Sequence, residues 1–178
     1  MAEGLAVESC SRCRSDALVH QVYSGQHLCG KHLSSSIRKR TSKELRIQLE
    51  LPKDATRLDG TPFRILVAIS GGKDSAVLLS MMSEIIGRRR DVELIAVCVD
   101  EGINGYRAPS MEFARELAKS LGVRFETMAY EEMGYERMDK VVQMMPSIGQ
   151  RHTEANGLMP CSYCGVFRRQ SLNTMAER

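Results

Sequence analysis

The feature that most limits how this chain can fold is an apolar run at residues 63–69, which leads directly into the polar loop 70–75, SGGKDS. The run has the length of a strand buried on both faces, and the residues after the loop have the apolar spacing of a helix. Further strands are predicted at 93–99 and 123–128, with helices near 74–87 and 109–121 and helical material at 131–145. Strands separated by helices form βαβ units with right-handed crossovers. The sequence therefore predicts an α/β fold with a parallel sheet and helices on both faces.

The loop combines glycines with a lysine and hydroxyls, in the order Ser70, Gly71, Gly72, Lys73, Asp74 and Ser75. Glycines allow a tight turn and a close approach of the backbone, and the N-terminus of the following helix attracts anions. Lys73 adds a full positive charge, so the loop predicts a phosphate site. It is not a Walker A loop, because the position that would need glycine is Val67. A glycine-rich turn without a ligand is the alternative, but it would not require the lysine and both hydroxyls.

The segment 10–32 has too few large apolar side chains for a hydrophobic core. It holds Cys10 and Cys13 and, after fifteen intervening residues, Cys29 and His32. Two such pairs are typical of a closed tetrahedral zinc site, which contributes on the order of 10 kcal/mol and can order a segment of this kind. We expect a structural zinc that helps to build a surface for RNA; unrelated thiols are the alternative. Two other histidines compete as ligands: His20 and His27.

A second cysteine pair, Cys161 and Cys164, opens a segment with helical character that carries Arg168 and Arg169. A helix N-terminus and cationic neighbours both stabilise thiolates. The pair can be half of a zinc site, a redox pair or two ligands of an iron-sulfur cluster, and the spacing does not decide among them. His152, nine residues earlier, is a further candidate ligand. The sixth cysteine, Cys98, falls within a predicted strand and is expected to be a buried small side chain.

Charge and composition bound the partners and the compartment. The net charge is +3, with basic clusters at 38–40, 88–90 and 168–169. Such clusters fit a polyanionic partner or solvated helix faces equally well. We find no signal peptide and no apolar run long enough to span a bilayer, so we expect a cytoplasmic protein without a membrane partner. A reducing compartment directs the cysteines toward metals or catalysis.

The domain organisation follows from these features. We predict a zinc-finger module at 1–33, a helix and linker at 34–62 with the helix at 33–51, and a partial catalytic domain at 63–178. Pro52 is expected to close the helix, and the linker is rich in Pro, Asp and Gly. Ligands of the catalytic domain are expected at the carboxyl ends of its strands.

The combination of SGGKDS, VDEGINGYR, PCSYCGVFRR and the two cysteine knuckles resembles the tRNA 2-thiolation family of the ATP pyrophosphatase superfamily. The resemblance covers residues 10–178 and implies that ATP activates the uracil C2 oxygen, with wobble uridine 34 as the target. It implies Mg2+ beside the nucleotide and a cofactor site made of Ala68, Ser70, Gly71, Gly72, Lys73, Asp74, Ser75, Asp100 and Arg168. Asp100 can instead be a strand-end cap and Arg168 a surface charge.

The resemblance also implies that Cys161 and Cys164 are catalytic and are two of three cysteine ligands of a 4Fe-4S cluster, whose third ligand is absent from this chain. The expected partners are tRNA, a sulfur donor (sulfide or a ubiquitin-like thiocarboxylate carrier) and a second copy in a homodimer. Because family features beyond residue 178 are absent, we expect an amino-terminal fragment that is inactive alone. The alternatives are another ATP pyrophosphatase, such as a lysidine-synthase-like enzyme or an amidotransferase, and a non-catalytic zinc-dependent RNA-binding module.

Overall fold

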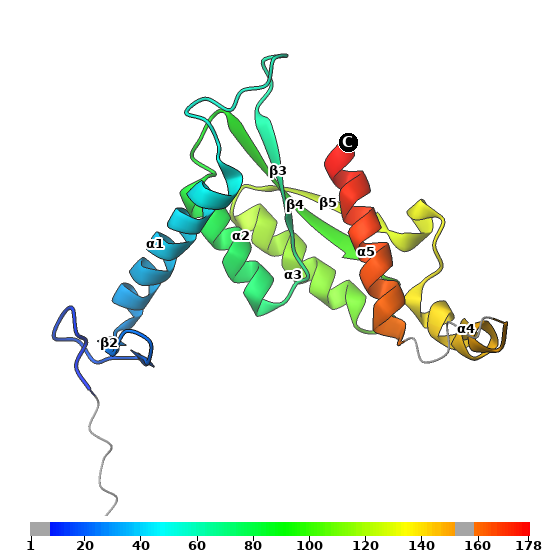
Figure 1. Ribbon diagram of the computed structural model, residues 1–178, viewed down its shortest axis with the longest axis horizontal. Coiled ribbons are helices and arrows are strands. Elements are labelled where there is room, and N and C mark those ends of the chain that lie inside the picture. Colours follow the sequence, from blue (N-terminus) through cyan, green and yellow to red (C-terminus); the bar gives the residue numbers. More distant parts are fainter. Residues whose placement is uncertain (1–7, 152–158) are drawn as a thin grey trace, which may run out of the picture. The chain divides into compact units, whose positions relative to one another are not determined.

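The computed structural model describes residues 8–146 and 159–178 in full and the backbone of 147–151. The chain forms two compact units, Met1–Lys53 and Asp54–Arg178 (Figure 1). The division falls within the segment that the sequence indicates as a helix and linker, so the helix belongs to the first unit and most of the linker to the second. None of the helices in the described ranges is long and apolar enough to cross a membrane.

The first unit is a short hairpin followed by one long helix. Strands β1 (Val19–Gln21) and β2 (Gln26–Leu28) pair antiparallel, and α1 (Gly30–Leu49) follows directly. The helix starts three residues before the predicted position, and it ends before Pro52 because Glu50 adopts a left-handed conformation with φ 46°.

The second unit is built on a parallel sheet in the order β3-β4-β5. These strands are Phe63–Ala68, Val92–Asp100 and Arg124–Ala129, and the helices between them are α2 (Lys73–Ile85) and α3 (Arg107–Ser120). The predicted α/β fold is confirmed. Its carboxyl edge brings the loop after β3 beside the end of β4, because Ala68 is in register with Val97.

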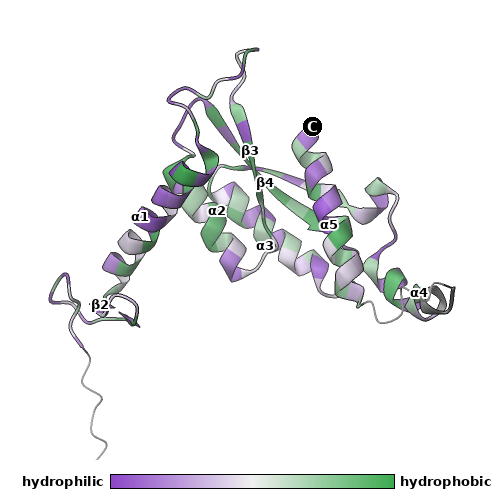
Figure 2. Cartoon of the chain, in the orientation of Figure 1, coloured by the Kyte–Doolittle hydropathy of each residue, from purple (hydrophilic) through white to green (hydrophobic). Residues whose placement is uncertain are grey.

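The middle strand is buried on both faces. Successive side chains of a strand point to opposite sides, and in β4 the alternate residues Ile95 and Val97 pack with Met175 of α5 (Pro160–Glu177). On the opposite face, Cys98 contacts Arg107 at the start of α3. Helices therefore cover both faces, and the strands β3 and β4 are largely apolar in Figure 2. This two-sided burial explains why residues 94–99 of β4 are all apolar.

Two further differences between the predicted and the observed helices have a clear physical cause. The helical material at 131–145 is divided into a 3-10 turn, η1 (Tyr130–Met133), and a helix, α4 (Met138–Arg151), because Gly134 takes a left-handed φ of 75°. Helix α3 begins two residues before Pro109, the predicted start, since proline is tolerated in the first turn of a helix.

Candidate functional site

The loop 70–75 is fastened by its own hydroxyl groups. The Ser75 hydroxyl accepts a hydrogen bond from the Ser70 N–H at 3.1 Å and donates to the Gly72 carbonyl at 2.9 Å. The Gly72 N–H in turn donates to the Ser70 hydroxyl at 3.3 Å. Gly71 has φ 85°, and a Cβ there would lie 2.0 Å from the Ser110 carbonyl oxygen. The loop therefore requires glycine at this position both for its conformation and for its close approach to α3.

A cavity of about 360 Å³ lies at the carboxyl edge beside this loop. Among its lining residues are Ala68, Ser70, Ser75 and Arg168, four of the residues that the sequence indicates for the nucleotide. At the start of α2, the side chains of Lys73 and Asp74 are 89% and 90% exposed and lie 3.4 Å apart. An exposed lysine at a helix N-terminus beside a cavity is well placed to meet a phosphate group.

Asp100 is not among the residues that line this cavity. Its Oδ1 accepts a hydrogen bond from the Gly102 N–H at 2.9 Å, and its side chain lines a second cavity of about 330 Å³ near the start of α3. In this structure Asp100 therefore caps the end of β4, the alternative that the sequence left open. The nucleotide role expected for Asp100 stays a prediction.

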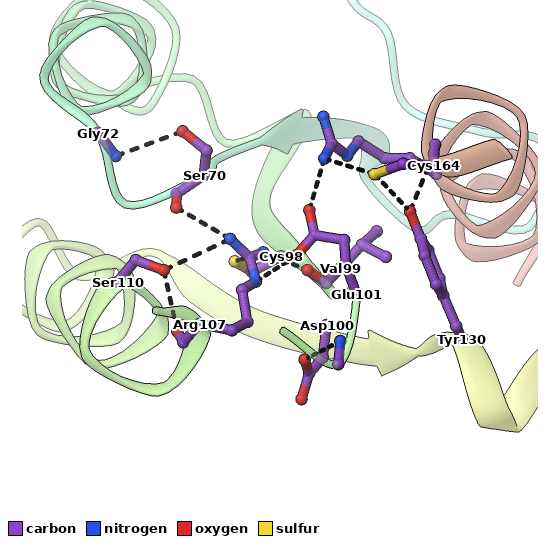
Figure 3. Close-up of polar contacts among 12 residues, drawn as sticks. Ser70, Gly72, Cys98, Val99, Asp100, Glu101, Arg107, Ser110, Tyr130 and Cys164 are labelled. Carbon is purple, nitrogen blue, oxygen red and sulfur yellow. Dashed lines mark hydrogen bonds and ion pairs between the residues drawn. The ribbon is translucent and has the colours of Figure 1, made fainter. Parts of the chain in front are cut away.

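A series of charged side chains, two of them buried, runs from the loop toward the second cysteine pair (Figure 3). Arg107 donates to the Ser70 carbonyl at 3.1 Å and to the Val99 carbonyl, and its Nε lies 2.6 Å from a carboxylate oxygen of Glu101. The other carboxylate oxygen of Glu101 lies 2.7 Å from the Arg168 guanidinium. The side chains of Glu101 and Arg107 are each 6% exposed, so both charges depend on these partners.

The cysteine pair lies in the first turns of α5, where Pro160 occupies the first helical position. Cys161 is exposed and Cys164 is half-buried, and Arg168 Nη2 lies 3.2 Å from the Cys164 Sγ. On the other side, the Tyr130 hydroxyl donates to the Cys164 carbonyl at 2.9 Å (Figure 3). Burial raises the pKa of Tyr130 well above its usual range, so the phenol remains a donor. Cys164 is therefore held between a cation and a neutral phenol.

The thiols of Cys161 and Cys164 suit iron, which thiolates ligate in iron-sulfur clusters. They supply only part of a ligand set. Within the described residues, a single group of three or more potential metal ligands comes together, and it is the amino-terminal one. His152 lies outside the described residues. Cys98 is fully buried, 2.9 Å from Arg107, and burial raises the pKa of its thiol.

In the first unit the four predicted zinc ligands converge. The ligand atoms of Cys10, Cys13, Cys29 and His32 all lie within 4.8 Å of one another. The Cys13 and Cys29 sulfurs are 3.7 Å apart, and the His32 Nδ1 lies 3.4 Å from Cys10 and 3.3 Å from Cys29. A tetrahedral zinc site with Zn–S bonds of about 2.3 Å has sulfurs about 3.8 Å apart, so the geometry fits this metal.

The electrostatics of the first unit also suit a cation. Burial alone would raise the pKa of the Cys10 thiol. Hydrogen bonds from the backbone of Cys29, Arg12 and Cys13 together outweigh burial and lower the pKa to about 6. A thiolate is the form that binds metal. The competing histidines His20 and His27 stack on each other across β1 and β2, with ring centroids 4.3 Å apart, and are not in the ligand group.

Three residues of the site were not singled out from the sequence: Glu101, Arg107 and Tyr130. Glu101 and Arg107 belong to VDEGINGYR, where only Asp100 was assigned a role. An acidic residue directly after a buried strand, six positions before an arginine, was a signal available in the sequence. Tyr130 gave no comparable signal, since its contact with Cys164 spans 34 positions.

The fold and the site together define a class: an α/β domain with an anion-binding loop at the carboxyl edge of its parallel sheet, preceded by a metal-binding knuckle module. The chain belongs to the PP-loop family, since the model of this ATP-binding domain matches residues 43–144. A model of the N-terminal LIM domain of the 2-thiouridine synthetase TtuA matches residues 9–34. The resemblance inferred from the motifs is thus confirmed.

Relatives support the same placement. The tRNA 2-thiolation protein NcsA of Haloferax volcanii is 38% identical over 168 residues, which are 94% of this chain and 49% of that protein. The cytoplasmic tRNA 2-thiolation protein 1 of Chlamydomonas reinhardtii is 37% identical over 111 residues, 62% of this chain and 28% of that protein. The solved structure of the U34-tRNA thiolase NcsA from Methanococcus maripaludis, with its 4Fe-4S cluster, matches with a TM-score of 0.70 and 26% identity, covering 94% of this chain and 50% of that one. The chain thus spans about half of these archaeal relatives.

Proposed function

We propose that this chain is the nucleotide-binding part of an ATP-dependent tRNA sulfurtransferase that forms 2-thiouridine at wobble uridine 34. The observation that carries the proposal is the short path from the phosphate loop to Cys164. The path runs from Ser70 through Arg107, Glu101 and Arg168, with each step between 2.6 and 3.2 Å. A thiolation reaction must bring an activated carbonyl and a sulfur together, and a continuous series of polar contacts between the loop and Cys164 supports this function.

In the first step, the loop holds the triphosphate of ATP and the uracil C2 oxygen attacks the α-phosphorus. A C–O–P bond forms, the bond between the α- and β-phosphates breaks, and pyrophosphate leaves. Lys73 is positioned to neutralise charge that develops on the phosphates, and Arg107 fixes the loop through the Ser70 carbonyl. In the second step, the sulfur of hydrosulfide bonds to C2, the C2–O bond breaks, AMP leaves with that oxygen, and the S–H proton passes to solvent.

We assign the accessory groups as follows. Mg2+ accompanies the nucleotide, and Asp74 of the loop provides an oxygen ligand. Zinc occupies Cys10, Cys13, Cys29 and His32, where four ligands leave no open position and the role is structural. Cys161 and Cys164 would hold a 4Fe-4S cluster together with a third cysteine that this chain does not contain. Such a cluster, when bound, supplies an iron that carries the sulfur.

The partners in this proposal are tRNA and a sulfur donor, either sulfide or a thiocarboxylate carrier. The first unit has nine Lys and Arg against five Asp and Glu, whereas the second has sixteen against seventeen. A positive charge concentrated on the metal-binding unit suits contact with RNA phosphates. A cytoplasmic location and a homodimer remain predictions from the sequence.

The test is a thiolation assay with the full-length protein, purified without oxygen and supplied with ATP, Mg2+, sulfide and unmodified tRNA. We expect 2-thiouridine at position 34 by nucleoside mass analysis, and its loss in Cys164→Ala. Ser162→Ala is the matched control, since Ser162 is exposed on the same helical turn. Formation of lysidine or an amidated product instead would indicate another ATP pyrophosphatase, and RNA binding without adenylation would indicate a non-catalytic module.

A further inference from the structure

Arg168 lies between two cavities and contributes to the lining of both. It lines the cavity of about 360 Å³ beside the phosphate loop. It also lines a third cavity, distinct from the one lined by Asp100, which has a volume of about 330 Å³ and is lined by Cys161 and Cys164 and by the apolar side chains of Ile103 and Met138. Its side chain is 49% exposed, so it can respond to a ligand in either cavity.

The anchor of Arg168 is Glu101, a buried carboxylate. One oxygen of Glu101 lies 2.7 Å from Arg168, and the other lies 2.6 Å from Arg107. Arg107 is fully engaged, because it also contacts the carbonyls of Ser70 and Val99 and the Cys98 sulfur. Glu101 therefore links a fixed guanidinium beneath the loop to an adaptable one beside the cysteine.

The charge balance of this cluster favours an anion. Two guanidinium groups share one carboxylate, which leaves one positive charge in a partly desolvated place. Charges interact more strongly there than in water, because the effective dielectric constant is lower. Without Glu101, the two arginines would repel each other and Arg168 would lose the ion pair that keeps it near Cys164.

We propose that Glu101 is a positioning residue that couples the nucleotide loop to Cys164 through Arg107 and Arg168. Nucleotide phosphates in the loop cavity order the Arg168 side chain against the Cys164 sulfur, so that binding at one site restricts access to the other. This inference rests on the proposed function for the identity of the nucleotide, but the coupling itself requires neither tRNA nor sulfur.

The test measures access to each thiol in the full-length protein, with zinc present and without iron. Iodoacetamide labels the cysteines at one pH, and peptide mass analysis gives separate rates for Cys164 and Cys161, with and without a non-hydrolysable ATP analogue. In the unmodified protein we expect the analogue to slow labelling of Cys164 by at least about threefold, the scale of a modest coupling between sites. Labelling of Cys161, which is exposed, should change less.

Glu101→Gln removes the charge and keeps the shape. We expect faster labelling of Cys164 without nucleotide and loss of the nucleotide effect, while affinity for the analogue stays within about threefold. Glu101→Asp, which retains the charge, should restore part of the effect; a merely structural role would not separate these two variants. Arg169→Gln, an exposed neighbour on the same helix, is the control and should behave as the unmodified protein.

Two results would overturn the proposal: no nucleotide effect on Cys164 in the unmodified protein, or a full effect in Glu101→Gln. If Glu101→Gln does not fold, Arg168→Gln takes its place, since that side chain is half exposed, and a full nucleotide effect in that variant also refutes the coupling. A protein that shows the coupling but forms no 2-thiouridine would refute the proposed function alone.

Discussion

The two compact units of this chain are stabilised in different ways. Among the described residues of the first unit, three hydrophobic side chains are buried, and two of these are the metal-ligand candidates Cys10 and Cys29. The second unit has a core of aliphatic residues on both faces of β4, joined by methionines from β5 and α5. Apolar burial therefore stabilises the second unit, whereas we expect the first unit to need a metal ion at its cysteine and histidine cluster.

The difference separates stability from function. In the second unit the functional groups lie at the edge of the sheet and at the start of a helix, outside the aliphatic core. Lys73 and Cys161, for example, are exposed. In the first unit the buried Cys10 and Cys29 are both core residues and candidate metal ligands. We therefore expect substitutions in the second unit to affect either folding or activity, whereas in the first unit they affect both.

Metal removal is the largest expected effect. Cys29→Ser, or chelation of the unmodified protein, should unfold the first unit, since metal binding supplies on the order of 10 kcal/mol there. Metal analysis should find one zinc per chain before treatment, and hydrogen exchange should show loss of protection in 8–53 with 63–146 unchanged. Cys161→Ser is the control. Continued protection of 8–53 without metal would contradict the difference between the units.

Truncation of the aliphatic core comes next. Ile95 is 4% exposed in the middle of β4, and Ile95→Ala should lower the free energy of unfolding of the second unit by about 2–5 kcal/mol. Urea unfolding of metal-loaded protein gives this value. Val77→Ala, on an exposed position of α2, should cost less than about 0.5 kcal/mol. Equal effects of the two substitutions would mean that β4 is not the centre of the core.

Removal of the Lys73 charge should lower the reaction rate without changing the stability of the fold. Lys73→Ala in the full-length protein should lower the rate of tRNA adenylation by at least about tenfold, the scale of removing one phosphate-stabilising charge. The melting temperature should stay the same, because the side chain is 89% exposed. Lys119→Ala, exposed at the end of α3, controls for the charge. Normal adenylation by Lys73→Ala would place the phosphates elsewhere.

The smallest effect concerns pH. The Arg89 guanidinium and the Ala55 N–H hold the pKa of Asp91 well below its usual value of 3.8. A lowered carboxyl pKa stabilises the fold above the unfolded value, and this contribution is lost as the pH falls below about 4. Asp91→Asn should therefore lower the melting temperature by a few degrees at pH 7 and by less at pH 3. Glu116→Gln, on an exposed position, should show no such difference. A deficit that stays constant with pH would contradict this reading.

The sequence alone was sufficient for the strands, for the loop between β3 and α2, and for the choice of the four cysteine and histidine side chains that converge in the first unit. These features are local: a buried strand is a continuous apolar run, and each knuckle pair lies three positions apart. The order of strands followed from the alternation with helices, because right-handed crossovers permit few arrangements. The break at Gly134 was missed because the helical pattern on both sides concealed a single left-handed residue.

The tertiary structure alone decided the connection between the two sites. Glu101 and Arg168 lie 67 positions apart, and their ion pair depends on the packing of α5 across the sheet. The sequence offered a signal for Glu101 and Arg107, but it could not show that Arg168 is the second partner of Glu101. The sequence determines the local elements and the charged side chains that they carry. Only the packing of α5 against the sheet determines that Glu101 and Arg168 come into contact.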